Sequence, residues 1–403
     1  MIHRLRGFVL PLVLLLAAVF LGVGFVVPSV WWGLVVVGPL AVLGVHDVVQ
    51  RHHSILRNYP ILGHLRFLLE DMGPELHQYM VESNTDGAPF DRDHRSLMYE
   101  RAKGVEDTKP FGTELPVYEV GYSWFVHSIN PRPLAERPSE TMRVRVGEGR
   151  CDKPYDASVL NTSAMSFGAL SGNAIMALNQ GAQLGGYAHN TGEGGFSKYH
   201  KQGGDVIWQV GTGYFGCRTD DGHFDIDRFT EQAQEEQVRM IEIKISQGAK
   251  PGHGGILPAS KVSEEIAEAR KVKPGVDCMS PTGHTAFTTP IGLLEFVAKL
   301  REASGGKPVG FKLCVGSVRE LFAIAKAMAE TKLLPDFVTV DGAEGGTGAA
   351  PVEFTNHIGM PLIEALVLVH NTLVGVGVRD QLRIIASGKR VTGFDIATAM
   401  ALG

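Results

Sequence analysis

The feature that most constrains the fold of this 403-residue chain is a rhythm that begins near residue 155. From there on, short apolar runs alternate with amphipathic, helix-like stretches, and glycine clusters follow many of the runs. Strands that alternate with helices predict a parallel sheet with right-handed crossovers. About 250 residues of this pattern favour an α/β fold of the (β/α)8 TIM-barrel type. A doubly wound open sheet is the alternative, and it fits less well because the glycine clusters are not confined to one or two switch points.

One loop in this pattern has the side chains of an anion-binding site. Residues 240–255, MIEIKISQGAKPGHGG, indicate a buried strand followed by a glycine-rich loop that includes Lys244, Gln247 and Lys250. Parallel strands of a barrel present the residues at their C-terminal ends to the face where active sites lie. Glycines let the backbone approach a ligand closely. The plain alternative is a surface loop with solvated lysines.

Three further loops at expected strand ends have matching chemistry. The first run, ASVLNTSAM (residues 157–165), predicts the first strand, and the small residues at its end would let a flat ring pack at the barrel mouth. A second loop holds an acid among glycines. Two glycine loops on late strands, the last of which opens a helix, predict a phosphate cradle. No GxxxxGK[ST] motif indicates a nucleotide triphosphate. The residues of these loops are Ser163, Ala164, Met165 and Ser166, then Glu193, then Asp341, Gly345, Gly346 and Thr347, and finally Ser387 and Gly388.

The N-terminus has a different character. Residues 7–27 contain no charge over 21 positions, which at 1.5 Å per residue is enough to cross a ~30 Å hydrocarbon layer. A second apolar run follows over residues 30–45, and arginines flank the pair at positions 4, 6, 51 and 57. The second run is short for a span, so residues 1–47 predict an anchor of one or two helices in the cytoplasmic membrane. If both runs span, the positive-inside rule predicts a hairpin with the catalytic domain facing the cytoplasm. A cleaved signal peptide is the alternative, but no small-residue cleavage site follows the first run.

The remaining organisation follows from composition. Residues 48–135 are polar, proline-containing and weakly amphipathic, which indicates a linker or capping segment before a barrel domain over residues 136–403. A net charge of −5 gives no footprint for nucleic acid. Four cysteines without ligand spacing predict no metal site and a reducing compartment.

The motifs AMSFGALS, NTGEGG, EIKISQGAKPGHGGILP, GFKL and DGAEGGTGAAP lie between about residues 155 and 403. With these motifs the chain resembles the FMN-binding synthase domain of glutamate synthase, in particular its stand-alone, membrane-anchored members. The resemblance implies an FMN-containing barrel that reduces 2-iminoglutarate, formed from 2-oxoglutarate and ammonia, to glutamate. Such an enzyme is an oxidoreductase of the class that acts on CH–NH2 donors.

The resemblance also implies roles for individual residues. Residues 163–166 and Gln209 would neighbour the flavin ring, and Lys312, on the GFKL strand, would lie near its electron-rich edge. The late glycine loops would hold the phosphate, whereas Glu193, Lys244, Gln247 and Lys250 would surround the substrate. The plain alternatives are a structural ion pair for Lys312 and a loop-fixing carboxylate for Glu193.

The chain also departs from the family pattern. Residue 2 is isoleucine, so no terminal cysteine nucleophile is present and ammonia would be free or supplied by a partner. The chain stops where a barrel would continue into its closing strand. We therefore expect GVDCMSP to be an insertion, seven barrel strands to be present, and the sequence to be truncated. An iron–sulfur cluster would require residues beyond that end.

Electrons would come from a donor protein or from an NAD(P)H reductase. One alternative function is a related flavin enzyme that acts on another imine or 2-oxo acid, as in N-methylglutamate formation. The other is a membrane-tethered partner protein without turnover.

Overall fold

The computed structural model describes residues 2–131, 133, 142–250, 252, 254–348 and 350–403, with side chains from residue 7 onward. The chain forms two compact units, Met1–His127 and Ser128–Gly403. The side chains of Arg4 and Arg6 lie outside the described part, as does the predicted boundary between residues 135 and 136.

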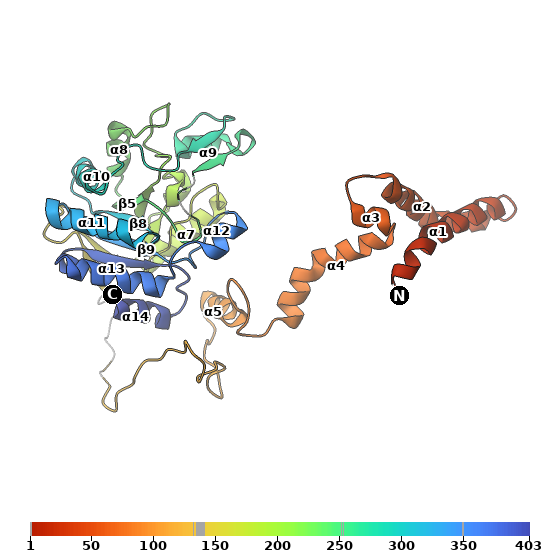
Figure 1. The fold of residues 1–403 in the computed structure, drawn as a ribbon, viewed down its shortest axis with the longest axis horizontal. Coiled ribbons are helices and arrows are strands. Elements are labelled where there is room, and N and C mark those ends of the chain that lie inside the picture. The colour runs from red at the N-terminus through yellow and green to blue at the C-terminus, as the bar shows by residue number, and fades with distance from the viewer. Residues whose placement is uncertain (1, 132, 134–141, 251, 253, 349) are drawn as a thin grey trace. The chain divides into compact units, whose positions relative to one another are not determined.

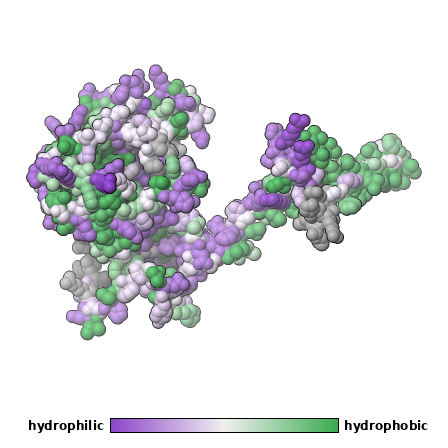
Figure 2. All heavy atoms as spheres, in the orientation of Figure 1, coloured by the Kyte–Doolittle hydropathy of each residue, from purple (hydrophilic) through white to green (hydrophobic). Residues whose placement is uncertain are grey.

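The first unit is helical. Two of its stretches, Gly7–Gly24 and Pro28–Val49, are long and apolar enough to cross a membrane by length and composition. Only 6% and 17% of these stretches is buried, so most of their apolar side chains are exposed (Figure 2). The helices of this unit are α1 (Ile2–Gly24), η1 (Pro28–Gly33), α2 (Leu34–Val49), α3 (Ser54–Asn58), α4 (Leu62–Leu76), η2 (His77–Val81) and α5 (Arg92–Lys103).

A buried carboxylate ties α4 to the end of α2. Asp47 is fully buried, and its carboxylate accepts hydrogen bonds from His64 Nε2 at 2.9 Å and from the backbone N–H of Ile61 at 2.9 Å. Ile61 also packs over Gly44, where a Cβ would meet it at 3.0 Å. His64 is therefore the partner of a buried acid.

The second unit is a parallel α/β fold (Figure 1). Its strands are β1 (Arg143–Val146), β2 (Tyr155–Ser158), β3 (Ala188–Asn190), β4 (Asp205–Val210), β5 (Val238–Lys244), β6 (Gly255–Leu257), β7 (Cys278–Ser280), β8 (Val309–Leu313), β9 (Phe337–Asp341) and β10 (Arg383–Ser387). Its α-helices are α7 (Gly172–Gly185), α8 (Ile226–Ala233), α9 (Glu264–Arg270), α10 (Pro290–Ala303), α11 (Val318–Thr331), α12 (Val352–His357), α13 (Leu362–Gly375) and α14 (Gly393–Leu402). Short 3₁₀ turns are η3 (Gly192–Gly194), η4 (Lys198–His200), η5 (Ala259–Lys261) and η6 (Arg379–Gln381).

The main sheet has the strand order β10-β9-β8-β5-β4-β3, and all its pairs are parallel. Apart from β6 and β7, which lie outside this sheet, neighbouring strands are successive along the chain, as in the wall of a (β/α)8 barrel. The sheet is curled, because Ala188 of β3 and Phe337 of β9 share one apolar cluster although three strands separate them. Within the described ranges the curled sheet stays open, with β3 and β10 at its edges.

The prediction of a first strand at ASVLNTSAM is largely wrong, so the main sheet in the described residues has six strands and not the expected seven. Its start belongs to β2, which pairs antiparallel with β1, and only Thr162 bridges in parallel to His189 of β3. The side chain of Asn161 takes up backbone groups that strand pairing would otherwise use. It donates a hydrogen bond to Ser158 O at 2.7 Å and accepts one from Ala188 N at 3.0 Å. These side-chain bonds compete with strand pairing.

The prediction that GVDCMSP is an insertion is confirmed. It contains β7, which pairs antiparallel with β6 and lies outside the main sheet. Residues 245–289 thus form an excursion between β5 and β8 that contains β6, α9 and β7.

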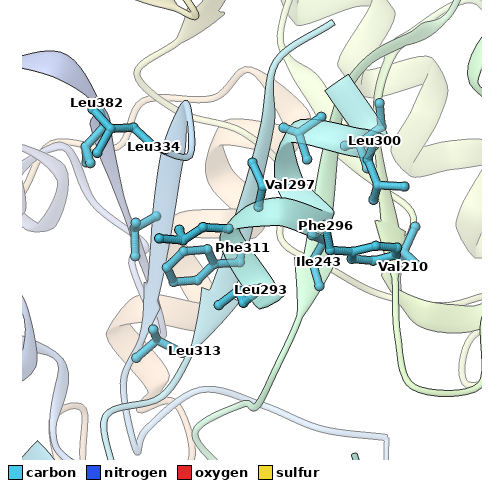
Figure 3. Packing of buried hydrophobic residues seen from close by; sticks show 14 of the residues in the cluster. Val210, Ile243, Leu293, Phe296, Val297, Leu300, Phe311, Leu313, Leu334 and Leu382 are labelled. Carbon is cyan, nitrogen blue, oxygen red and sulfur yellow. The ribbon is translucent and has the colours of Figure 1, made fainter. Parts of the chain in front are cut away.

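Apolar side chains fill both faces of the curled sheet. On the outer face, Ile243, Phe311 and Leu313 pack against α10 residues such as Leu293 and Phe296 (Figure 3). On the inner face, Ile207, Met240 and Phe337 pack against the β1–β2 hairpin at the N-terminal end of the strands. The C-terminal end of the strands is left for polar side chains.

Candidate functional site

The inner face of the sheet changes from apolar to polar toward the C-terminal ends of the strands. Successive side chains of a strand point to opposite faces, so Ile241 and Ile243 of β5 enter the outer core, whereas Glu242 and Lys244 point inward. Glu242 is 2% exposed. Its carboxyl group accepts hydrogen bonds from Asn190 Nδ2 at 2.8 Å, Gln209 Nε2 at 2.6 Å and Thr339 Oγ1 at 2.5 Å. Gln209, predicted to lie beside a flavin ring, therefore belongs to a buried network.

Lys244 and Glu193 form an ion pair one layer above this network. Lys244 ends β5 and its side chain is 10% exposed, and its ammonium group bonds the carboxylate of Glu193 from the loop after β3. Burial lowers the pKa of Lys244, and Glu193 offsets part of that effect. Burial raises the pKa of Glu193, but the fields of Lys244, Lys250 and Lys312 outweigh it, so the net pKa lies below its usual value. The three lysines therefore create a positive field around one carboxylate.

Asp341 joins four elements at the same end of the sheet. One carboxylate oxygen accepts from Ser387 Oγ at 2.7 Å, and the other accepts from the backbone N–H of Gly248 at 2.9 Å. Lys312 Nζ lies 3.4 Å from that second oxygen, and both partners are buried. Asp341, predicted to contact the cofactor, thus fixes Lys312 and the neighbouring loops. The hydroxyl of Ser387, a predicted phosphate ligand, is engaged with Asp341.

The loops predicted to act together are neighbours. A Cβ at Gly248 would overlap the carbonyl oxygen of Gly342, so the loop after β5 touches the loop after β9. A Cβ at Gly388 would lie 3.5 Å from Gly345 N, so the loop after β10 touches the same place. Within the described residues, the N–H groups of Gly346 and Thr347 make no hydrogen bond to a protein acceptor. They are available to an anion.

The segment predicted to contact a flat ring lies beside the loop that holds Glu193. A Cβ at Gly192 would lie 2.7 Å from Ser166 N and 3.0 Å from the carbonyl carbon of Met165. Residues 163–166, with Ser163 and Ala164 at their start, are therefore at the same mouth as the lysines. Gly192 and Gly194 of the NTGEGG loop are needed here because a side chain at either position would displace this segment.

Gln247 places a side-chain hydrogen-bond donor at this mouth that has no acceptor among the described residues. Gln247 and Lys250 pair across a tight antiparallel bridge in the loop after β5. The side-chain nitrogen of Gln247 is buried and has no hydrogen-bond partner in the described part of the chain. A buried donor without a partner costs free energy unless a ligand or water accepts its hydrogen bond.

Two residues of the site were missed from the sequence. Glu242 follows from the alternation Met240, Glu242, Lys244, which puts a second charged residue on the inner face of β5. Arg270 had no such signal. It ends α9 in the excursion, stacks on Phe215 with 4.7 Å to the ring centroid, and its Nη2 would lie 3.2 Å from a Cβ at Gly168. Its Nε is buried and has no hydrogen-bond partner among the described residues, and burial lowers the pKa of its guanidinium.

The arrangement suits a ligand with several negative charges. Lysine and arginine donors in a partly dry site give charge-assisted hydrogen bonds to carboxylates or phosphates. The described residues contain no group of three or more His, Cys, Asp or Glu side chains that could hold a metal ion.

The family model that matches this chain and the relatives named below all have glutamate synthase in their descriptions. Residues 141–403 match a family model described as a conserved region in glutamate synthase. The glutamate synthase large subunit-like protein YerD of Bacillus subtilis is 37% identical over 397 residues, covering 89% of this chain and 75% of that protein. An archaeal-type NADPH glutamate synthase of Thermotoga neapolitana is 36% identical over 243 residues, covering 60% of this chain but only 45% of that protein.

Solved structures are more distant. A mandelate oxidase with a C4a-OH-FMN adduct superposes with a TM-score of 0.40 and 14% identity, covering 68% of this chain and 70% of that one. A flavocytochrome b2 with benzoylformate gives a TM-score of 0.38 and 13% identity, covering 65% and 58% of the two chains.

Proposed function

The chain belongs to the glutamate synthase family, and from that membership we propose that it is an FMN-dependent oxidoreductase that reduces 2-iminoglutarate to glutamate. The observation that carries the proposal is the convergence of Lys244, Gln247, Lys312 and the two late glycine loops at one end of the sheet. The chain spans less than half of the length of the Thermotoga relative. The complete activity is therefore part of the proposal.

The residues present fit a flavin mononucleotide. The N–H groups of Gly346 and Thr347, which have no acceptor among the described residues, would hold the phosphate together with the loop at Gly345, Ser387 and Gly388. Such backbone donors at late strands of a parallel fold are a usual phosphate site. When bound and reduced by the electron donor, FMN would supply a hydride to the substrate carbon. Residues 163–166 would pack against the ring, and Lys312 would place a positive charge beside it.

The substrate would be held by the remaining donors. A 2-oxo diacid has two carboxylates, and Lys244, Lys250 and Arg270 all lie close enough to Glu193 to interact with its charge. The orphan amide of Gln247 would donate to the same ligand. Glu193 would hold Lys244 in place and accept an N–H of the imine. Ammonia and electrons would come from solution or from partners.

An activity assay on the full chain tests the proposal. With 2-oxoglutarate, ammonium and a reduced-dye donor, we expect glutamate formation that Lys244→Ala abolishes. Lys261→Ala, an exposed lysine of the same excursion, should leave turnover unchanged. Replacing ammonium by methylamine distinguishes an N-methylglutamate-forming enzyme. A flavin-loaded chain that turns over none of these substrates would contradict the proposal and favour a partner protein.

We further propose that α1 and α2 anchor the chain as a membrane hairpin with both ends in the cytoplasm. The support is the exposed apolar surface of two stretches long enough to span a bilayer. The apolar face of α4, with Leu65, Leu68 and Met72 about half exposed, would then lie in the lipid interface. Alkaline carbonate should leave the chain in the membrane pellet; release into the supernatant would refute the anchor.

A further inference from the structure

The carbonyl group of Lys244 has a partner far along the chain. The pairing of β4 with β5 ends at Val210 and Ile243, so the carbonyl of Lys244 lies past the last pair. His284, from the excursion between β5 and β8, places its Nε2 2.8 Å from that oxygen. A carbonyl oxygen only accepts, so Nε2 carries the proton and donates.

Tyr214 fixes the other nitrogen of the imidazole. The Tyr214 hydroxyl oxygen lies 3.1 Å from His284 Nδ1 and accepts the backbone N–H of Ala286 at 3.0 Å. In a neutral imidazole with Nε2 protonated, Nδ1 accepts, so the hydroxyl donates to it. Every polar atom in this series of hydrogen bonds then has a partner. Of the two neutral tautomers of His284, only the one protonated at Nε2 allows this.

The imidazole has little freedom to move. Tyr214 is fully buried and His284 is 8% exposed. The His284 ring stacks on Phe287, with centroids 4.8 Å apart and planes 19° apart, and meets Tyr214 at 5.4 Å. Phe287 in turn packs on Phe296 of α10, which belongs to the main apolar core. The core thus fixes the ring that holds the end of β5.

We propose that His284 is a positioning residue for the active site, which fixes the carbonyl of Lys244 so that the ammonium group of Lys244 stays on Glu193 and in the pocket. The inference rests on the proposed function, because Lys244 is the residue placed there for the substrate. The excursion then has two tasks at one site: it supplies Arg270 and it fixes Lys244.

The test compares variants of the full chain by two readouts. The variants are His284→Leu, His284→Gln and Tyr214→Phe, with Tyr155→Phe as the matched control. Tyr155 is also a buried tyrosine, but its hydroxyl bonds Asp205 at 2.9 Å, away from Lys244. The first readout is the labelling rate of Lys244 by an amine-reactive reagent without substrate, measured by mass spectrometry. The second is 2-oxoglutarate binding by calorimetry.

In His284→Leu we expect Lys244 labelling to rise and 2-oxoglutarate affinity to fall about tenfold, as for the loss of one buried hydrogen bond. His284→Gln should restore both values toward the parent, because its amide nitrogen can donate to the same carbonyl. Tyr214→Phe should raise labelling of Lys244, whereas Tyr155→Phe should not.

Unchanged labelling of Lys244 in a folded His284→Leu chain overturns the proposal, as does a Gln variant no better than Leu. If His284→Leu does not fold, equal labelling in the two tyrosine variants overturns it. A parent chain that fails to bind 2-oxoglutarate while labelling follows the expected order refutes the proposed substrate but supports the positioning role.

Discussion

Glu242 is the residue on which the buried polar contacts inside the sheet converge. Asn190, Gln209 and Thr339, from three different strands, all donate to its carboxyl group. A buried donor that loses its acceptor keeps its desolvation cost. The stability of the sheet interior therefore depends strongly on this one side chain.

Glu242→Leu should lower the free energy of unfolding by roughly 3–5 kcal/mol, because three buried donors lose their acceptor at once. Thr339→Val, which removes a single donor, should cost about 1 kcal/mol. Denaturant titration of both variants and the parent gives the comparison. A Leu variant no less stable than the Val variant would show that the network does not support the fold.

At the level of residues, the sequence is informative where a single strand decides the outcome. The alternation of β5 places Lys244 on the inner face, and the same alternation would have identified Glu242. Arg270 and His284 could not be found in this way. Their contacts with Phe215 and with the carbonyl of Lys244 join segments 55 and 40 residues apart, which only the packing of the excursion brings together.

Among the elements, the loops after β5, β9 and β10 form one junction. Parallel strands end on the same side of a sheet, so the sequence could predict that these loops would be neighbours. Their closeness depends on glycine: Gly248 lies where any side chain would overlap the backbone of Gly342, and its N–H binds Asp341.

Gly248→Ala should separate the two loops and weaken FMN binding about tenfold or more, because the overlap is with backbone that cannot rotate away. Fluorescence titration of FMN measures this. Gly255→Ala is the control, since a Cβ there meets nothing within 4 Å. FMN binding that is equally strong in both variants would exclude the junction from the cofactor site.

The first expected strand shows why element boundaries were harder to predict. ASVLNTSAM has the composition of a strand, but the Asn161 side chain takes the hydrogen bonds that a ladder would use. Composition does not reveal such competition, because it depends on which backbone groups face Asn161 in the folded chain.

For the whole molecule, the buried His189 of β3 and its neighbour His200 predict that the folded state loses stability in acid. His189 and His200 have ring centroids 5.3 Å apart. Burial lowers the pKa of His189 to about 4 and, together with the field of His189, that of His200 to about 3, from an ordinary value of 6.5. Unfolding lets both take up protons, so their contribution is complete above pH 6.5 and is lost as the pH falls toward 4 and 3.

Below pH 6.5 the free energy of unfolding should therefore fall by about 1.4 kcal/mol per pH unit for each histidine. Denaturant titrations between about pH 7 and about pH 5 measure the slope. In His189→Leu the slope of the free energy of unfolding against pH should decrease by about 1.4 kcal/mol per pH unit, the contribution of one proton. Both ring nitrogens of His189 lack partners among the described residues, so the ring is expected to be neutral in the folded chain. An unchanged slope would mean that His189 is not buried as a neutral ring.

The central claim is that one end of this curled sheet holds a flavin phosphate while buried lysines hold a dicarboxylate next to the ring. FMN titration into the purified full chain, followed by addition of 2-oxoglutarate, tests it most directly. We predict equimolar FMN binding and a change in the flavin absorbance spectrum when 2-oxoglutarate is added, and we predict that Lys244→Ala removes that change but still binds FMN. A folded chain that does not bind FMN, or a spectrum that 2-oxoglutarate leaves unaltered, would contradict the claim.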